Sequence, residues 1–190
     1  EVIANRAIEI LGGALGDYSL VNPNNDVNMA QSSNDVIPTA IRVACVLEGK
    51  RMLAELGALE NAIREKGEGF KSIVKTGRTH LQDAVPITLQ QEFLAWANAV
   101  EADLPSLKNA VERLRVLGIG VTAIGTGINT HPKFRELAVK KISGNSGERF
   151  VPGKDPIELT NNMNAFLEFS SAMRASAVTL VRDANDLKLL

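Results

Sequence analysis

The sequence predicts an all-α protein, a bundle of long helices. Aromatic residues make up only 4% of the chain, whereas Ala, Leu, Val and Ile are plentiful, and strands are the elements in which aromatic side chains are enriched. Three long stretches carry apolar residues three and four positions apart, which is the spacing of a helix that buries one face. Short stretches rich in Gly, Pro and Asn separate these helical patterns.

Each expected helix has its own boundary signals. A first helical face covers residues 1–11 and is closed by Gly12 and Gly13. The long helices are expected at 34–66, where Pro38 is tolerated in the first turn, at 89–117, where Pro105 should cause a kink, and at 159–187. On the helix at 89–117, a heptad-like seam is formed by Phe93, Trp96, Val100, Leu107, Val111 and Leu114. A short helix is expected at 132–142. Residues 17–26, 75–88, 118–129 and 143–156 are predicted to be turns and irregular segments.

The last helix has the most regular pattern, with steps of four and three residues as in a coiled-coil seam. The seam consists of Leu159, Met163, Phe166, Ser170, Met173, Ala177, Leu180, Ala184 and Leu187. Such a seam needs a partner helix, and an elongated bundle leaves seams that its own chain does not cover. We therefore expect this chain to form a homo-oligomer.

Composition and charge exclude several classes of function. The 21 basic and 22 acidic residues are well mixed, so no broad basic surface is available for nucleic acid. Cys45 is the only cysteine and there are two histidines, which leaves no disulfide and little material for a metal site. No apolar run reaches the length of a membrane span, and the first residues lack a signal pattern. We expect a soluble, cytoplasmic protein without a cofactor or metal.

Two polar segments are candidates for a binding site. In Gln31-Ser-Ser-Asn-Asp35, the side chains suit a helix N-cap, and they also suit a carboxylate ligand at the positive end of a helix. The two interpretations are compatible, because one residue can cap while others face a ligand. In Gly77-Arg-Thr-His80, the histidine has a hydroxyl, an amide and a carboxylate as near neighbours. A histidine there could donate to an anion or relay a proton, although a lone histidine is more often structural.

A third segment, residues 118–129, is rich in glycine. It superficially suggests a nucleotide-binding loop, but it follows a predicted helix and no Gly-Lys-Ser/Thr comes after it. We therefore reject nucleotide binding. A close backbone crossing between helices that only glycine permits is the simpler interpretation.

Four motifs together resemble the fumarase/aspartase family across nearly the whole chain. They are EVIANRAIEILGG, QSSNDVIPTAIRVA, GRTHLQDAVPITL and TAIGTGINTHP, in the family's order. The resemblance implies an all-helical homotetramer whose central helices pack into one bundle. It also implies cofactor-free elimination from a C4 dicarboxylate through an aci-carboxylate, which fixed hydrogen-bond donors stabilise. Carried over by motif, Ser32, Ser33, Asn34, Thr79 and His80 contact the substrate, and Thr79 and His80 belong to the catalytic set.

Smaller differences favour the aspartate ammonia-lyase branch of the family over the fumarate hydratase branch. Asn22 stands where similar fumarases usually have His, and the segments at 84–86, 122–125 and 155–158 also look more like aspartases. The segment 129–132 and Ser33 point toward fumarases. Fumarate hydratase therefore stays open as an alternative, and so does a helical assembly module without chemistry.

The resemblance also implies where this chain lies within the family's pattern. Residues 1–33 correspond to the end of an N-terminal helical domain, and residues 34–190 correspond to part of the central bundle domain. The family's upstream Gly-Thr-Ser segment and its downstream loop with the catalytic serine both lie outside these residues. We therefore expect the 190 residues by themselves to lack lyase activity.

Overall fold

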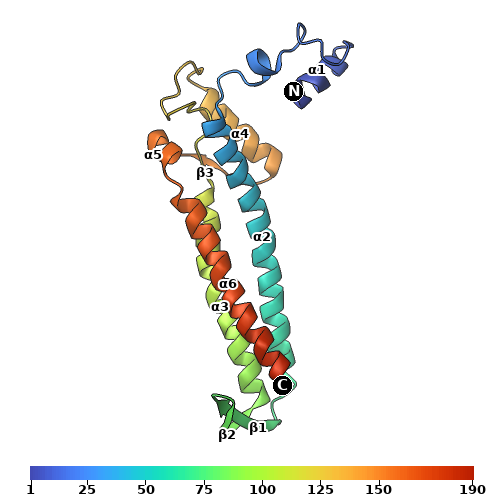
Figure 1. The fold of residues 1–190 in the computed structure, drawn as a ribbon, viewed down its shortest axis with the longest axis vertical. Coiled ribbons are helices and arrows are strands. Elements are labelled where there is room, and N and C mark those ends of the chain that lie inside the picture. The colour runs from blue at the N-terminus through green and yellow to red at the C-terminus, as the bar shows by residue number, and fades with distance from the viewer. The chain divides into compact units, whose positions relative to one another are not determined.

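The computed structural model describes residues 1–190 and consists mainly of helices (Figure 1). The helices are α1 (Val2–Ile10), the π-helical turn η1 (Pro23–Val27), α2 (Ser33–Glu68), α3 (Leu89–Leu114), α4 (Phe134–Ser146), α5 (Pro156–Asn161) and α6 (Asn164–Leu189). Four short strands accompany them: β1 (Val74–Thr79), β2 (Gln82–Thr88), β3 (Val116–Leu117) and β4 (Val151–Pro152). The predicted fold class, a bundle of long helices, is confirmed.

The chain forms two compact units. Unit 1 comprises residues 1–42 and 116–162, and unit 2 comprises residues 43–115 and 163–190. The first turns of α2 therefore belong to unit 1, and the rest of this helix belongs to unit 2. The expected division of the chain into a domain end at 1–33 and a bundle part at 34–190 stays a prediction.

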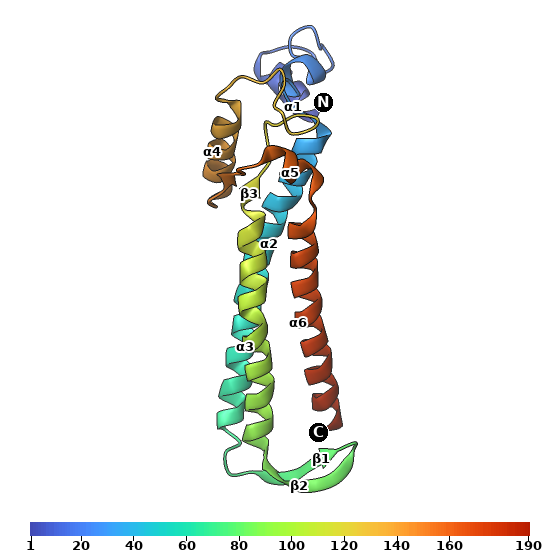
Figure 2. The same cartoon turned by 90° about the vertical axis from the view of Figure 1, so that its left-hand side faces the viewer.

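Unit 2 is built from antiparallel long helices. Arg113 pairs with Glu168 near one end of α3, and Trp96 Nε1 donates to Asp186 Oδ2 near the other, so α3 and α6 run side by side in opposite directions (Figure 2). A Cβ on Gly49 of α2 would lie 2.6 Å from Val111, so the two helices approach closely there. Five of the six residues of the predicted α3 seam are buried, and Phe93 is half-buried: the five are Trp96, Val100, Leu107, Val111 and Leu114.

The prediction for the last helix was wrong in two respects. Asn162 has extended backbone angles and ends α5, so α6 begins only at Asn164. The buried residues of α6 are Ala165, Phe169, Ser176 and Asp183, each one position before a predicted seam residue. Because one residue turns a helix by about 100°, the predicted seam lies beside the buried face rather than on it. Leu187 of that seam is 48% exposed.

The segment at 75–88, predicted to be irregular, is a β-hairpin. β1 and β2 pair in antiparallel register from Val74 opposite Thr88 to Thr79 opposite Gln82, with an irregularity at Gly77. The hairpin leads directly into α3, where the Thr88 side chain accepts from Gln91 N and completes a capping box. This register leaves only two residues to turn the chain at the hairpin tip.

Unit 1 has its own small core and a two-stranded connection. β3 pairs with β4 in parallel, which explains why α3 stops at Leu114 rather than continuing to residue 117. Helix α4 runs on to Ser146 because Gly147 takes a left-handed conformation, with φ of 70°, and ends it. Buried apolar residues of this unit are Ala4, Ile8, Leu117, Ile119, Val121, Val139 and Phe150. None of the helices in either unit is long and apolar enough to cross a membrane.

Candidate functional site

Ser32 is the residue that starts α2. Its carbonyl oxygen accepts from Val36 N at 2.9 Å, and its hydroxyl accepts from Asn34 N at 3.1 Å. In return, Asp35 Oδ1 accepts from Ser32 N at 2.9 Å, so the side chains of Ser32 and Asp35 satisfy backbone N–H groups at the helix start reciprocally. The capping interpretation of this segment is therefore confirmed for Ser32.

The second carboxylate oxygen of Asp35 holds a distant loop. Asp35 Oδ2 accepts from Gly120 N and from Thr122 N, each at 3.0 Å. Only 2% of Asp35 is exposed, so this carboxylate is removed from water and three backbone N–H groups take the place of its hydration. One buried side chain thus ties the start of α2 to the loop at 120–122.

Ser33 and Asn34 remain on the surface beside this anchor. Both residues are exposed, and the Asn34 side chain donates from Nδ2 to Ala123 O at 2.7 Å. The Asn34 amide keeps its oxygen and a second N–H for another partner. The positive end of the α2 dipole lies at the same place and favours an anion. The predicted residues Ser32, Ser33 and Asn34 therefore form one polar surface in unit 1.

The glycine-rich segment at 118–129 makes a close backbone crossing, as the sequence predicts. A Cβ on Gly125, where φ is +98°, would lie 2.6 Å from Ile157 Cα, so only glycine fits this crossing. Thr122 adopts a φ of +59° although it is β-branched, which is an outlier for such a residue. The loop is thus held in a strained form, and Asp35 is one of the groups that hold it.

In unit 2, Thr79 and His80 lie at the tip of the β1–β2 hairpin. His80 and Leu81 form its two-residue turn, with φ of +50° and +60°. Turns of this kind normally use Asn or Gly, because positive φ strains other residues. His80 and Leu81 are both exposed. A strained backbone that burial does not explain favours a functional role for the tip.

His80 lines an open pocket of about 360 Å³ in unit 2. Arg78 and Lys75 line it too, and Lys75 Nζ pairs with Glu92 Oε2 at 2.7 Å. The other lining residues are Thr76, Leu81, Glu92, Asp186, Leu189 and Leu190. Arg78 in turn pairs with Asp83 at 3.5 Å, so the lining carries both signs of charge around His80.

The structure brings the predicted residues together as two sets, one in each unit. Whether Ser32–Asn34 and Thr79–His80 converge on one ligand stays a prediction.

The sequence interpretation missed two residues of these surfaces, Asp35 and Arg78. Asp35 was visible in the sequence only as a possible cap, and Arg78 was visible only as part of the Gly-Arg-Thr-His motif. Burial raises the pKa of the Cys45 thiol, which disfavours the reactive thiolate.

Comparison with known proteins assigns the fold first. The chain superposes with a TM-score of 0.95 on the crystal structure of fumarate lyase:delta crystallin from Brucella melitensis bound to cobalt. The identity is 44%, and the match covers 100% of this chain and 41% of that one. The fold is therefore that of the fumarate lyases.

The sequence then assigns the family. The chain belongs to the Lyase family, whose model matches residues 1–190. It is 50% identical to the aspartate ammonia-lyase of Pseudomonas canavaninivorans and 44% identical to the class II fumarate hydratase of Helicobacter pylori, each over 100% of this chain. The chain spans 40% of the length of the first of these relatives and 41% of the second. The family predicted from the four motifs is confirmed.

Proposed function

We propose that the full-length protein is a lyase that reversibly eliminates ammonia from L-aspartate to give fumarate. The observation that carries this proposal is the 50% identity to a curated aspartate ammonia-lyase over the whole chain. Curated relatives of the same name from Pseudomonas fluorescens and Pseudomonas aeruginosa are 49% and 48% identical. The two polar surfaces of the chain suit a substrate with two carboxylates.

The proposed chemistry is an anti-elimination. A base removes the proton from C3, the electron pair forms the C2–C3 double bond, and the C2–N bond breaks to release ammonia. On the way, the carboxylate next to C3 gains a second negative charge as an aci-carboxylate, which needs fixed hydrogen-bond donors. Ser33 and Asn34, at the positive end of α2, are the donors that we assign to a substrate carboxylate.

We assign Thr79 and His80 to the reacting end of the substrate. The histidine sits in a strained turn, exposed, beside the cationic Arg78 and Lys75. An imidazole there can donate a hydrogen bond to an anionic intermediate or relay a proton, and the Thr79 hydroxyl supplies another donor. The assignment of both residues rests on the motif and on this local geometry.

Fumarate hydratase is the second candidate, because a class II fumarate hydratase is 44% identical over the whole chain. Asn22 does not decide between the two. Its side-chain oxygen accepts from Asn24 N and Asn25 N and caps η1, so local structure already accounts for an asparagine at this position. The branch therefore has to be decided by activity.

The deciding experiment offers L-aspartate and L-malate separately to the full-length protein and follows fumarate by its ultraviolet absorbance. We expect turnover of aspartate with release of one ammonia per fumarate, and little turnover of malate. Faster turnover of malate would replace the proposal with fumarate hydratase. Turnover of neither substrate by a folded protein would favour the assembly module.

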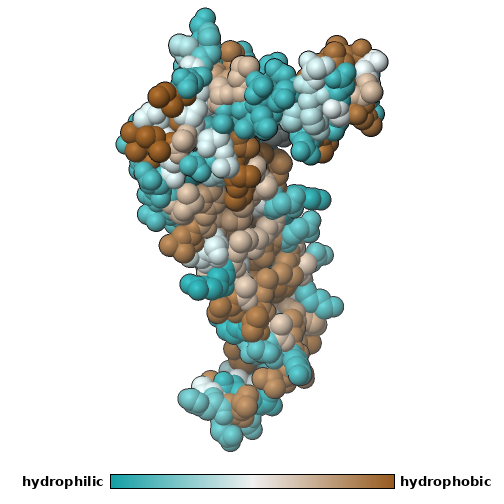
Figure 3. All heavy atoms as spheres, turned by 45° about the horizontal axis from the view of Figure 1, so that its top comes forward, coloured by the Kyte–Doolittle hydropathy of each residue, from teal (hydrophilic) through white to brown (hydrophobic).

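We further propose that the protein works as a homo-oligomer, a tetramer as in the family pattern. Several large apolar side chains of α6 are exposed: Leu167, Val178, Val181, Leu187 and Leu189. Figure 3 shows hydrophobic surface along the long helices. Val178 and Val181 are 66% and 61% exposed.

Light scattering on the full-length protein should give the mass of a tetramer. The double variant Val178→Glu, Val181→Glu should dissociate it. A monomeric wild-type protein would contradict this proposal.

A further inference from the structure

Asp35 joins two segments that are far apart in the sequence through one buried carboxylate. Its Oδ1 accepts from Ser32 N at 2.9 Å, and its Oδ2 accepts from Gly120 N and Thr122 N at 3.0 Å. Hydrogen bonds to an ionised acceptor are about twice as strong as neutral ones, and burial excludes competing water. The carboxylate therefore fixes the distance between the start of α2 and the loop.

Asn34 lies between the two segments that Asp35 joins. Its backbone N–H donates to Ser32 Oγ at 3.1 Å, and its side-chain N–H donates to Ala123 O at 2.7 Å. Asp35 holds Ser32 on one side and Thr122, the neighbour of Ala123, on the other. The orientation of the exposed Asn34 amide therefore depends on both halves of the Asp35 anchor.

Asp35 supplies part of what holds the loop in this form, beside the hydrogen bond from Gly127 N to Val121 O at 2.8 Å. Thr122 has a φ of +59°, which strains a β-branched residue, and its N–H is one of the three that Asp35 accepts. Without the carboxylate, the backbone at 120–122 would lose two hydrogen bonds and relax. Ala123 O would then move away from the Asn34 amide.

We propose that Asp35 is a positioning residue for substrate: it does not touch the dicarboxylate, but it sets the direction of the Asn34 amide that does. This inference rests on the proposed function, in which Asn34 contacts a substrate carboxylate. Asparagine is the informative replacement, because an amide keeps the size of Asp35 but offers one oxygen instead of two. Its NH₂ group would face a backbone N–H, and one side of the anchor would open.

The test measures Asp35→Asn, Asn34→Ala and the double variant in the full-length protein. Since a contact made in both ground and transition states appears in KM, we expect Asp35→Asn to raise the KM for aspartate about tenfold with kcat within about threefold. The inhibition constant of succinate, a dicarboxylate that cannot eliminate, should rise in parallel. In the Asn34→Ala background, Asp35→Asn should change KM by less than about twofold, because the amide that it positions is already absent.

Asp155→Asn is the matched control. Asp155 also accepts two backbone N–H groups at a helix start, from Ile157 and Glu158, but it adjoins no residue assigned to substrate. Asn caps helices as well as Asp, so KM and melting temperature should both be unchanged. If Asp35→Asn does not fold, Gly120→Ala replaces it: a Cβ there would lie 3.0 Å from Arg135 Cα and would displace the N–H that Asp35 accepts, so KM should rise about threefold.

The outcomes separate the two proposals. A folded wild-type protein that turns over neither aspartate nor malate overturns the proposed function, and the role of Asp35 falls with it. An active wild type whose Asp35→Asn variant keeps its KM within twofold overturns the positioning role alone. Equal effects of Asp35→Asn with and without Asn34→Ala would show a merely structural residue.

Discussion

The start of α2 and the tip of the β1–β2 hairpin carry the two candidate parts of the site, and they are built in opposite ways. At the start of α2, a buried carboxylate accepts three backbone N–H groups and holds the exposed Asn34 in place. At the hairpin tip, His80 and Leu81 are exposed and sit in a strained two-residue turn. The first part is thus held by its own unit, whereas the second is defined only by local backbone geometry.

The contrast predicts which substitutions change the stability of the fold and which change activity. When a side chain that accepts hydrogen bonds from buried N–H groups is removed, those donors lose their partners and the fold is destabilised. Removing an exposed side chain from a strained turn costs little stability, so its loss should appear in catalysis alone. Three pairs of substitutions examine this contrast, and a fourth pair examines an ion-pair network away from both regions.

The largest expected effect is that of His80→Ala on activity. In the full-length protein, kcat/KM for aspartate should fall about a hundredfold or more, because a positioned acid or base contributes at least that much. The free energy of unfolding should change by less than about 0.5 kcal/mol, because the side chain is exposed. His131→Ala is the control, since His131 is also exposed but lies in unit 1 and accepts only from Lys133 N. A similar fall in kcat/KM in both variants would contradict a catalytic role for His80.

Asp35→Ala should produce the largest loss of stability. Three backbone N–H groups lose their acceptor, and we expect about 3 kcal/mol less free energy of unfolding in urea titrations. Asp155→Ala removes an exposed cap whose Oδ1 accepts from two backbone N–H groups, and it should cost only about 1 kcal/mol. Equal costs for the two aspartates would show that burial of Asp35 adds nothing to its anchoring.

Leu81→Gly should stabilise the protein while leaving Thr79 and His80 in register. Glycine adopts the φ of +60° without strain, which favours the variant by about 1 kcal/mol after its greater flexibility in the unfolded chain is subtracted. Val85→Gly is the opposing control, because Val85 is exposed in β2 and glycine weakens a strand. The melting temperature should therefore rise in Leu81→Gly and fall in Val85→Gly.

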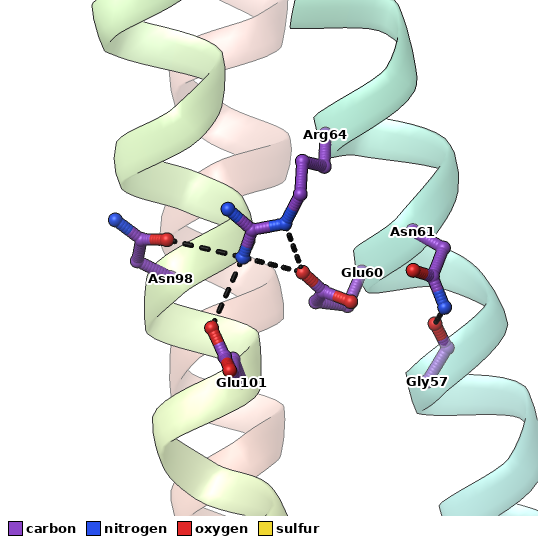
Figure 4. A network of polar contacts seen from close by, with 6 residues as sticks. All are labelled: Gly57, Glu60, Asn61, Arg64, Asn98 and Glu101. Atoms are coloured by element: carbon purple, nitrogen blue, oxygen red, sulfur yellow. Dashed lines mark hydrogen bonds and ion pairs between the residues drawn. The ribbon is translucent and has the colours of Figure 1, made fainter.

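The smallest effect is expected in the Arg64 network of unit 2, which joins α2 to α3 (Figure 4). Arg64 donates to Glu60 on its own helix and to Asn98 and Glu101 on α3. The Glu101 side chain is 64% exposed, so Glu101→Gln should cost about 0.5 kcal/mol or less and should cost nothing in high salt. Glu60→Gln should cost more, because only 11% of that side chain is exposed.

Much of the fold could be predicted from helical periodicity. The prediction was accurate where the apolar face of a helix packs within its own chain. The seam of α3 was predicted correctly because Trp96, Val100, Leu107 and Leu114 are large and apolar, and they are buried within their own chain. The seam of α6 was misplaced by one residue because the side that packs inward is partly polar, with Ser176 and Asp183 buried. Periodicity finds the most apolar face of a helix, which need not be the inner one.

The candidate site was predictable at its motifs but not at its supports. Ser32 and His80 stand in recognisable segments, whereas the anchor depends on Asp35 meeting Gly120 and Thr122, which lie 85 and 87 positions away in the sequence. No local pattern reveals such a pairing. The hairpin was also missed, because its turn residues, His80 and Leu81, are not those that signal a two-residue turn.

The contact between α3 and α6 also gives the molecule a built-in spectroscopic reporter. Trp96 is the only tryptophan of the chain, and its indole N–H donates to Asp186, on the side of α6 that faces α3. Any movement of α6 away from α3 would break this contact and change the surroundings of the indole. Tryptophan emission should therefore report the separation of α6 from α3, and a urea titration followed by fluorescence would detect it.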